Sequence, residues 1–249
     1  MRNFLPISAP ELVFVGDTHF RSRAQTGEAV RRDRFLRFLA SIPAGTGLFL
    51  MGDIFDFFFE YRSVVHRRYL DLFCALAACR ERGVETHFIG GNHDYWVGGF
   101  LADELGVRTH RDEILLDAQG RRLVCAHGDL VIPGDWGYKA LKTIIRNPAV
   151  VAASRWIHPD LLAAVAAGVS AGSRKLKAPV HEARARALAE HAHRRFFARG
   201  NDAFVMGHIH FPLLDSRDGR DFVIIGDWVE HATFVRLSGG ALTLETFTG

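Results

Sequence analysis

The segment Glu85-Thr86-His87-Phe88-Ile89-Gly90-Gly91-Asn92-His93-Asp94 joins an apolar run to a polar cluster. The run ends in two glycines, which predicts a buried strand that leads into a tight loop. The polar residues that follow would pack poorly in a core, but they offer an amide oxygen, an imidazole and a carboxylate close together. Alone, the tetrapeptide Gly91-Asn92-His93-Asp94 is a weak signal of function, and its interpretation depends on the rest of the chain.

Four other apolar runs lead into similar polar groups. They cover residues 11–15, 47–51, 121–126 and 203–206, and each is followed by an acid or a histidine. Because ligands of open α/β sheets bind at the carboxyl ends of strands, one shared site is the simplest interpretation. The candidate ligands at that site are Asp17, His19, Asp53, Asn92, His127, His208 and His210.

The segments between these runs indicate the fold class. Residues 29–40 and 63–82 have apolar positions at helical spacing, and a short helix is expected over 100–105. The tail reads as strands over 222–225, 233–237 and 242–247. This pattern predicts an α/β fold, with a layered core of two mixed β-sheets flanked by helices. Residues 130–201 give no strand signal, so we expect a single domain over 1–249 with a helical cap inserted at about 139–198.

Composition excludes some classes of protein. The 249 residues are 48% hydrophobic and 24% charged, as in a globular protein, and the formal net charge is +3. This mild basicity suits an anionic substrate or a membrane surface without requiring either, and we expect no nucleic-acid partner. No apolar window is long enough to span a membrane and no signal peptide is visible, which predicts a cytoplasmic protein with peripheral membrane contact left open. Oligomeric state is also left open. Reduced, buried thiols are expected at Cys74, Cys79 and Cys125.

The candidate ligands favour a centre of two metal ions. They are carboxylates, imidazoles and one amide, without thiolate, which suits Mn²⁺, Fe²⁺ or Zn²⁺. Seven ligands are too many for one tetrahedral ion, whereas a carboxylate can bridge two ions roughly 3.5–4 Å apart. Two such ions can lower the pKa of a shared water and offset charge on a phosphoryl group. The ligand set therefore predicts metal-assisted hydrolysis of phosphoesters.

In chain order, the clusters resemble the five motifs of the calcineurin-like metallophosphoesterases: Asp-x-His, Gly-Asp, Gly-Asn-His-Asp, His-Gly-Asp and Gly-His-x-His. The resemblance implies one ion held by Asp17, His19, Asp53 and His210. It implies a second ion held by Asp53, Asn92, His127 and His208, which makes Asp53 the bridge. In such a site His93 is the catalytic group that faces the substrate phosphate, and Asp94 orients its ring.

Within that superfamily the chain resembles the UDP-2,3-diacylglucosamine pyrophosphohydrolases of lipid A synthesis. The similar stretches are Gly52-Asp53-Ile54-Phe55-Asp56, Asp135-Trp136-Gly137-Tyr138 and Gly226-Asp227-Trp228, together with the position of the insertion. The chain departs at His93 and Ser170, where the best-known branch carries Arg. The resemblance implies a nucleotide-linked lipid cleaved to UMP and lipid X, two ions that are most often Mn²⁺, and substrate-binding residues Asp135, Tyr138, Ser173, Arg174 and Lys177.

Two stretches bear on a lipid substrate. The apolar residues 149–167 precede a basic stretch at 173–177, which suits a diacylated diphosphate, although such helices could equally pack on the core. Phe57-Phe58-Phe59 follows Asp56, and three consecutive aromatics cannot all face one way, so at least one is expected at a pocket mouth.

Two other functions compete with this one. The first is a phosphodiesterase or phosphatase that acts on a soluble nucleotide or another phosphoester. The second is a non-catalytic scaffold, which is disfavoured because a scaffold would be expected to lose ligands and all seven are present.

Overall fold

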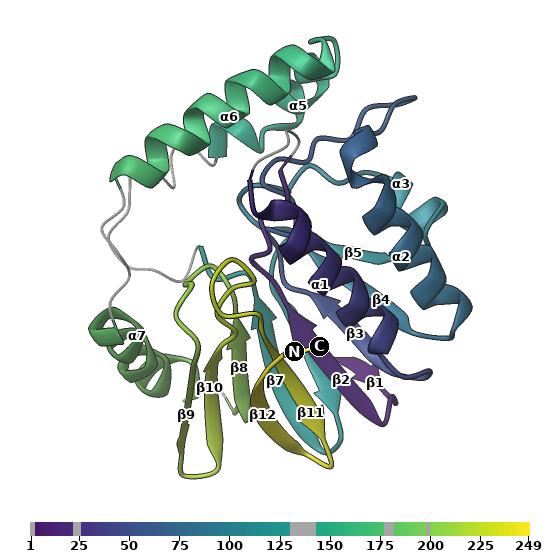
Figure 1. The fold of residues 1–249 in the computed structure, drawn as a ribbon. Coiled ribbons are helices and arrows are strands. Elements are labelled where there is room, and N and C mark those ends of the chain that lie inside the picture. The colour runs from purple at the N-terminus through teal and green to yellow at the C-terminus, as the bar shows by residue number, and fades with distance from the viewer. Residues whose placement is uncertain (1–2, 22–25, 130–142, 177–181, 198–199) are drawn as a thin grey trace.

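The computed structural model describes residues 3–21, 26–129, 143–176, 182–197 and 200–249. Two six-stranded sheets face each other, with helices on their outer sides (Figure 1). The first sheet has, in order, β12 (Ala241–Thr246), β11 (Thr233–Ser238), β2 (Glu11–Val15), β3 (Gly47–Leu50), β4 (Glu85–Ile89) and β5 (Arg108–His110). The second has β1 (Leu5–Ile7), β6 (Ile114–Ala118), β7 (Arg121–Ala126), β8 (Ala203–Met206), β10 (Arg220–Ile224) and β9 (Leu213–Arg217). The predicted α/β class with two mixed sheets is confirmed.

Three apolar layers hold the sheets and helices together. Helices α1 (Glu28–Ser41) and α2 (Leu70–Glu81) cover the outer face of the first sheet, where Phe35 is fully buried. Phe14 and Phe49 stack between the two sheets with ring centroids 5.0 Å apart. Helix α7 (Glu182–Arg195) lays its small residues on the outer face of the second sheet, against Phe204. Each fully buried Phe stabilises the fold by about 1.5–3 kcal/mol.

Parallel pairing decides where the polar loops lie. Strands β2, β3 and β4 are parallel neighbours in one sheet, and β7 and β8 are parallel neighbours in the other. The carboxyl ends of neighbouring parallel strands share an edge, so the five predicted clusters are carried to the same edge of the two-sheet core.

The five strands that lead into the clusters lie where the sequence predicts them, and four other strands were missed. β1 and β5 are three-residue edge strands, and β1 contains Pro6, which is tolerated at an edge. β6 and β9 form hairpins with β7 and β10. The β9–β10 turn is Asp218-Gly219, and both residues have positive φ, so this dipeptide was an available hairpin signal.

Two helices begin later or end earlier than predicted. The segment expected to be helical over 63–82 contains the 3₁₀ turn η1 (Arg67–Tyr69) followed by α2, so residues 63–66 are not helical. The expected helix at 100–105 is the single turn α3 (Phe100–Asp103). Of the three cysteines, Cys79 and Cys125 are buried and free as expected, whereas Cys74 is exposed, so its predicted burial is wrong.

The insertion contains helices with different surroundings. Helices α5 (Pro148–Ser154) and α6 (Pro159–Leu176) lie apart from both sheets in Figure 1. By contrast, α7 packs on the second sheet through Ala185, Leu188 and Ala189. The extent of the predicted cap stays a prediction. None of the described helices is long and apolar enough to cross a membrane.

Candidate metal centre

The loops after the five strands converge, and their backbone is unusual at the candidate ligands. Asp17, His19, Asp53 and His208 all have positive φ, between 46° and 65°. Such conformations cost of order 1–3 kcal/mol each for non-glycine residues and cluster at functional sites. Gly91 packs against Asp53 so closely that an added Cβ would lie 2.2 Å from its Oδ1, so only glycine fits there.

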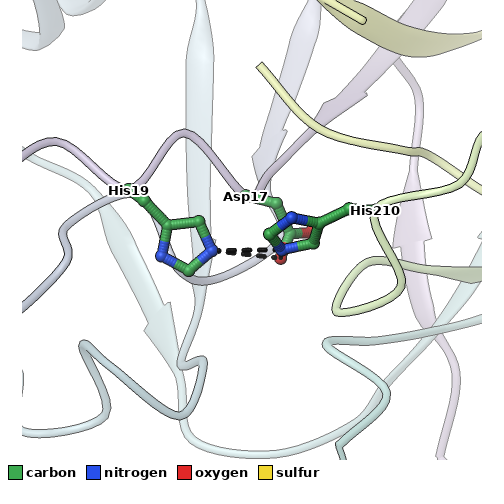
Figure 2. Close-up of side chains that lie close together, drawn as sticks. All are labelled: Asp17, His19 and His210. Atoms are coloured by element: carbon green, nitrogen blue, oxygen red, sulfur yellow. Dashed lines mark hydrogen bonds and ion pairs between the residues drawn. The ribbon is translucent and has the colours of Figure 1, made fainter. Parts of the chain in front are cut away.

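The first cluster joins Asp17, His19 and His210, which come from the loops after β2 and β8 (Figure 2). The Nε2 atoms of the two histidines face each other at 3.2 Å. Asp17 Oδ1 lies 3.5 Å from Nε2 of His210 and 3.9 Å from Nε2 of His19, and it accepts no hydrogen bond from the described residues. Two imidazole nitrogens and a buried carboxylate oxygen around one point are a donor set that fits a cation.

The second cluster joins Asp53, His127 and His208, with the amide of Asn92 beside it. His127 Nε2 lies 3.4 Å from Asp53 Oδ2, 3.3 Å from His208 Nδ1 and 3.1 Å from Asn92 Oδ1. Its Nδ1 donates to the carbonyl of Met51 at 3.0 Å, which leaves Nε2 free to act as a ligand. This donor set also fits a cation.

Asp53 belongs to the second cluster and also lies beside His19 of the first. Its Oδ1 accepts the backbone N–H groups of Asn92 and His93, both at 2.9 Å. Its Oδ2 therefore faces the site, 3.4 Å from His127 Nε2 and 3.9 Å from His19 Nε2. One oxygen oriented by the backbone and one directed at both clusters is the arrangement expected of a bridging carboxylate.

His93 lies at the edge of both clusters. Its Nε2 is 4.0 Å from Asp53 Oδ2, and its ring meets that of His19 edge-on, with centroids 5.0 Å apart. Its Nδ1 donates to the main-chain oxygen of Asp56 at 2.9 Å, and the Asp56 carboxylate is 3.9 Å away. This holds Nε2 toward the site, where it can exchange a proton with a substrate.

The prediction that Asp94 orients the ring of His93 is wrong. Asp94 is fully buried, and its oxygens accept backbone N–H groups from the two loops that carry Asp53 and Asn92. The donors and their distances are Asp53 at 3.0 Å, Ile54 at 2.7 Å, Phe55 at 3.2 Å and Gly91 at 2.9 Å. Asp94 therefore fixes two ligand-bearing loops to each other, and the acid nearest the outer nitrogen of His93 is Asp56.

Asp94→Ala is accordingly expected to destabilise the fold. Four buried N–H groups would lose their acceptor, and each unsatisfied group costs about 1–3 kcal/mol, so we expect the free energy of unfolding to fall by about 3 kcal/mol or more. Urea unfolding of the metal-free protein measures this. Asp33→Ala, at an exposed ion pair on α1, is the control and should cost less than about 1 kcal/mol. Equal losses in the two variants would contradict this role of Asp94.

The site attracts positive charge. Burial lowers the pKa of His127, but Asp53 outweighs burial and raises that pKa to about 10. Burial also opposes the charge on His210, yet its ion pairs with Asp17 and Asp227 raise its pKa to about 10. Burial raises the pKa of Asp53, whereas His127 and His93 hold it well below its usual range. Ionised carboxylates thus create a negative potential that protons can neutralise and that divalent cations can neutralise more fully.

Metal loading should therefore release protons. With pKa values near 10, His127 and His210 carry protons at pH 8 in the metal-free protein and must lose them to act as ligands. We expect Mn²⁺ affinity to rise with pH up to about 10, the pKa of both groups. Calorimetric titration in two buffers of different ionisation enthalpy counts the protons released. Binding with no proton release and no pH dependence would contradict this electrostatic description.

Comparison with known families agrees with this geometry. The model of the family described as calcineurin-like phosphoesterase matches residues 11–212, most of the chain. The chain belongs to the calcineurin-like phosphoesterase family. This calcineurin-like phosphoesterase is a metal-dependent hydrolase of phosphoric esters, and its histidine and aspartate clusters can hold divalent metal.

Its relatives cover nearly the whole chain. UDP-2,3-diacylglucosamine hydrolase of Porphyromonas gingivalis is 29% identical, over 95% of this phosphoesterase and 97% of the relative. The protein of the same name from Stenotrophomonas maltophilia is 28% identical, over 94% and 97% of the two chains. A solved archaeal phosphodiesterase is 10% identical, over 94% of this chain and 98% of its own, with a TM-score of 0.44.

The predicted substrate-binding residues are not brought to the site by the described part of the phosphoesterase. Asp135, Tyr138 and Lys177 lie outside the described residues. Ser173 and Arg174 belong to α6, and their side chains are also outside the description. These assignments stay predictions.

Other residues reach the site without having been predicted there. Asp227 lies 3.2 Å from the outer nitrogen of His210, and an acid directly after strand β10 was the available signal. Arg146 joins the insertion to the site, because its guanidinium donates to the carbonyl of Gly91 at 3.2 Å and lies 3.5 Å from the centre of the Tyr95 ring. No spacing rule signals that contact.

Proposed function

We propose that this phosphoesterase is a two-metal hydrolase that cleaves the diphosphate of UDP-2,3-diacylglucosamine, releasing UMP and the lipid monosaccharide phosphate. The proposal is supported by two relatives of that name that cover nearly the whole chain. It is carried by an apolar pocket that begins one residue from Asp56, the partner of His93. We assign the two ions as Mn²⁺, with Fe²⁺ or Zn²⁺ able to use the same ligands.

We assign the first ion to Asp17, His19, Asp53 and His210, and the second to Asp53, Asn92, His127 and His208. When bound, two such ions supply Lewis-acid polarisation of a phosphoryl oxygen and lower the pKa of a shared water. His93 is assigned the proton transfer to the leaving phosphate oxygen or the stabilisation of charge on the attacked phosphate. Its Nδ1–H donates to the main-chain oxygen of Asp56, so Nε2 is the ring atom that faces the site and exchanges the proton.

The pocket has the chemistry for an acyl chain. Its volume is about 290 Å³, and it lies between the loop after Asp56 and the start of α6. The loop contributes Phe57, Phe58 and Phe59, so the expectation that at least one of the three aromatics reaches a pocket agrees with the geometry. The insertion contributes Pro159 and Ala163. A lipid tail in this pocket would extend from a phosphate at His93 into an apolar space.

Exposed apolar side chains near the pocket favour action at a membrane surface. Val64 and Val65 line the pocket and are also exposed, and the side chains of Trp156, Leu161 and Val165 on the insertion are more than half exposed. Tyr61 joins the two segments by donating to the carbonyl of Ile157 at 3.1 Å. Aromatic and aliphatic groups of this kind are typical of interfacial contacts. We therefore propose peripheral binding at the cytoplasmic face of the inner membrane, with residues 139–198 acting as the cap.

The substrate class is tested by a panel of phosphoesters. Mn²⁺-loaded protein is expected to hydrolyse UDP-2,3-diacylglucosamine at least a hundredfold more efficiently than unacylated UDP-N-acetylglucosamine, since each buried methylene contributes about 0.8 kcal/mol. Turnover of soluble nucleotides or phosphodiesters without turnover of the acylated substrate would replace this function by that of a soluble phosphodiesterase.

Ala163→Trp, which fills the pocket from α6, should raise KM for the acylated substrate about a hundredfold, because several methylenes lose their burial. It should leave hydrolysis of bis-p-nitrophenyl phosphate unchanged, which also reports that the metal site is intact. Ala152→Trp, at an exposed position of α5, is the control. An unchanged KM in Ala163→Trp would exclude this pocket as the acyl site.

A further inference from the structure

A buried carboxylate lies directly behind one of the proposed ligands. Asp227 is 2% exposed, and its Oδ2 lies 3.2 Å from Nδ1 of His210. The other ring nitrogen of His210, Nε2, faces His19 and Asp17 (Figure 2). The Oδ1 of Asp227 accepts the backbone N–H groups of Glu230 at 3.0 Å and His231 at 3.2 Å, and lies 3.1 Å from Nδ1 of His231. The carboxylate is thus fixed in orientation, with one oxygen reserved for His210.

The loop that carries Asp227 is anchored to the core and to the site. The indole of Trp228 is buried against Phe35, with ring centroids 4.9 Å apart. The backbone N–H of Trp228 donates to the carbonyl of Asp17 at 3.2 Å. The loop therefore contacts two proposed ligands of the first ion, one through the backbone and one through a side chain.

We propose that Asp227 is a positioning residue that selects the tautomer of His210 for binding the first ion. The Nδ1–H of His210 donates to Asp227, so the nitrogen that gives up its proton to the ion is Nε2, 3.5 Å from Asp17 Oδ1 and 3.2 Å from His19 Nε2. A carboxylate behind an imidazole ligand fixes the ring and strengthens its donation to a metal. This inference rests on the proposed ligand set.

The two clusters differ in this support. In the second cluster, the outer nitrogen of His127 donates to a neutral acceptor, the carbonyl of Met51. Among the described residues, the Asp227 carboxylate contacts His210 and its own loop, so its support goes to the first cluster. Loss of its charge should consequently weaken one ion and spare the other.

Asp227→Asn is the variant that distinguishes an effect on the tautomer of His210 from an effect on the packing of the loop. The amide oxygen can take over the backbone N–H groups of Glu230 and His231, which places the NH₂ group against Nδ1 of His210. Since that NH₂ can only donate, the proton of His210 must move to Nε2, the atom that should bind the ion. In a titration with Mn²⁺ alone, wild-type protein should bind two ions. The variant should bind one with unchanged affinity and the other about 10–100-fold more weakly.

Calorimetry gives the two affinities, and Mn²⁺ electron paramagnetic resonance reports the coupling between paired ions, which should disappear at stoichiometric loading of Asp227→Asn. His231→Gln is the matched control, since it removes the other imidazole from Asp227 and should keep both affinities within about twofold. Loss of both ions in Asp227→Asn, or the same loss in His231→Gln, would show that loop packing decides the result and would overturn the proposal.

A measurement on wild-type protein keeps the proposal testable if the variant fails to fold. In Zn²⁺-loaded protein, long-range ¹H–¹⁵N spectra of the histidine rings should show His210 protonated at Nδ1, and protonation at Nε2 would overturn the assignment. Wild-type protein that binds fewer than two ions would instead contradict the proposed ligand set. Two ions in wild type and two equally tight ions in Asp227→Asn would contradict this inference alone.

Discussion

Asp53→Asn is expected to abolish two-metal binding and to reduce hydrolysis by about three orders of magnitude. The variant keeps an oxygen that can accept the N–H groups of Asn92 and His93, so the loop retains its anchors. It loses the negative charge and the oxygen that faces both clusters, 3.4 Å from His127 and 3.9 Å from His19. Metal ions supply several kcal/mol of transition-state stabilisation, and each 1.36 kcal/mol is tenfold in rate.

Elemental analysis after Mn²⁺ loading and gel filtration measures the metal content of Asp53→Asn. Asp221→Asn is the control, because Asp221 pairs with Arg121 at the start of β10, at the other end of that strand from Asp227. The control should retain two ions and full activity. Retention of two ions in Asp53→Asn would remove Asp53 from its assigned role as the bridge.

His93→Ala is expected to retain both ions and to lose rate, with kcat reduced about 10²–10⁴-fold, the usual contribution of a proton-transfer group. The side chain of His93 stays 4.0 Å from Asp53 Oδ2, and its backbone N–H rather than its ring supports Asp53. Removal of the ring therefore leaves the bridging carboxylate in place.

The separation of metal content from kcat is the measurement for His93. Metal analysis should give the wild-type ratio, and Mn²⁺ titration should give unchanged affinities. A His93→Ala variant that lacks one ion would instead show that His93 is a ligand. Its ring nitrogen and ligand atoms of His19 and Asp53 all lie within 4.8 Å of one another.

Much of the site could be predicted from sequence because each ligand directly follows a strand. Asp17, Asp53 and His127 come within a few residues of apolar runs that form β2, β3 and β7, and parallel pairing then brings those strand ends together. Helices α1 and α2 could also be predicted, because their apolar residues recur at helical spacing. Edge strands such as β5 carry too few residues to show any period.

The partner of His93 was harder to predict because it is not its neighbour in sequence. The backbone bends at residues 92–94, and Asp94 accepts N–H groups of the loops behind the site while His93 faces the clusters. The acid beside His93 is Asp56, which comes from the loop after β3. Contacts of this kind depend on how two loops pack.

Helix α7 shows the same limit. Its small residues, including Ala185 and Ala189, suit either a cap or a cover for the second sheet, and the structure packs them against that sheet. On α5 and α6, by contrast, the apolar side chains of Val150, Leu161 and Val165 are exposed. Sequences of similar composition are thus packed on a sheet in one helix and exposed in another, and only the tertiary structure distinguishes the two cases.

In the proposed centre, Asp53 bridges two ions between the loops that follow β2, β4, β7 and β8. Anomalous diffraction from crystals of the Mn²⁺-loaded protein tests it most directly. We expect two peaks roughly 3.5–4 Å apart, one beside Asp17, His19 and His210 and one beside Asn92, His127 and His208, with Asp53 Oδ2 between them. A single peak, or two peaks that do not share Asp53, would contradict the claim.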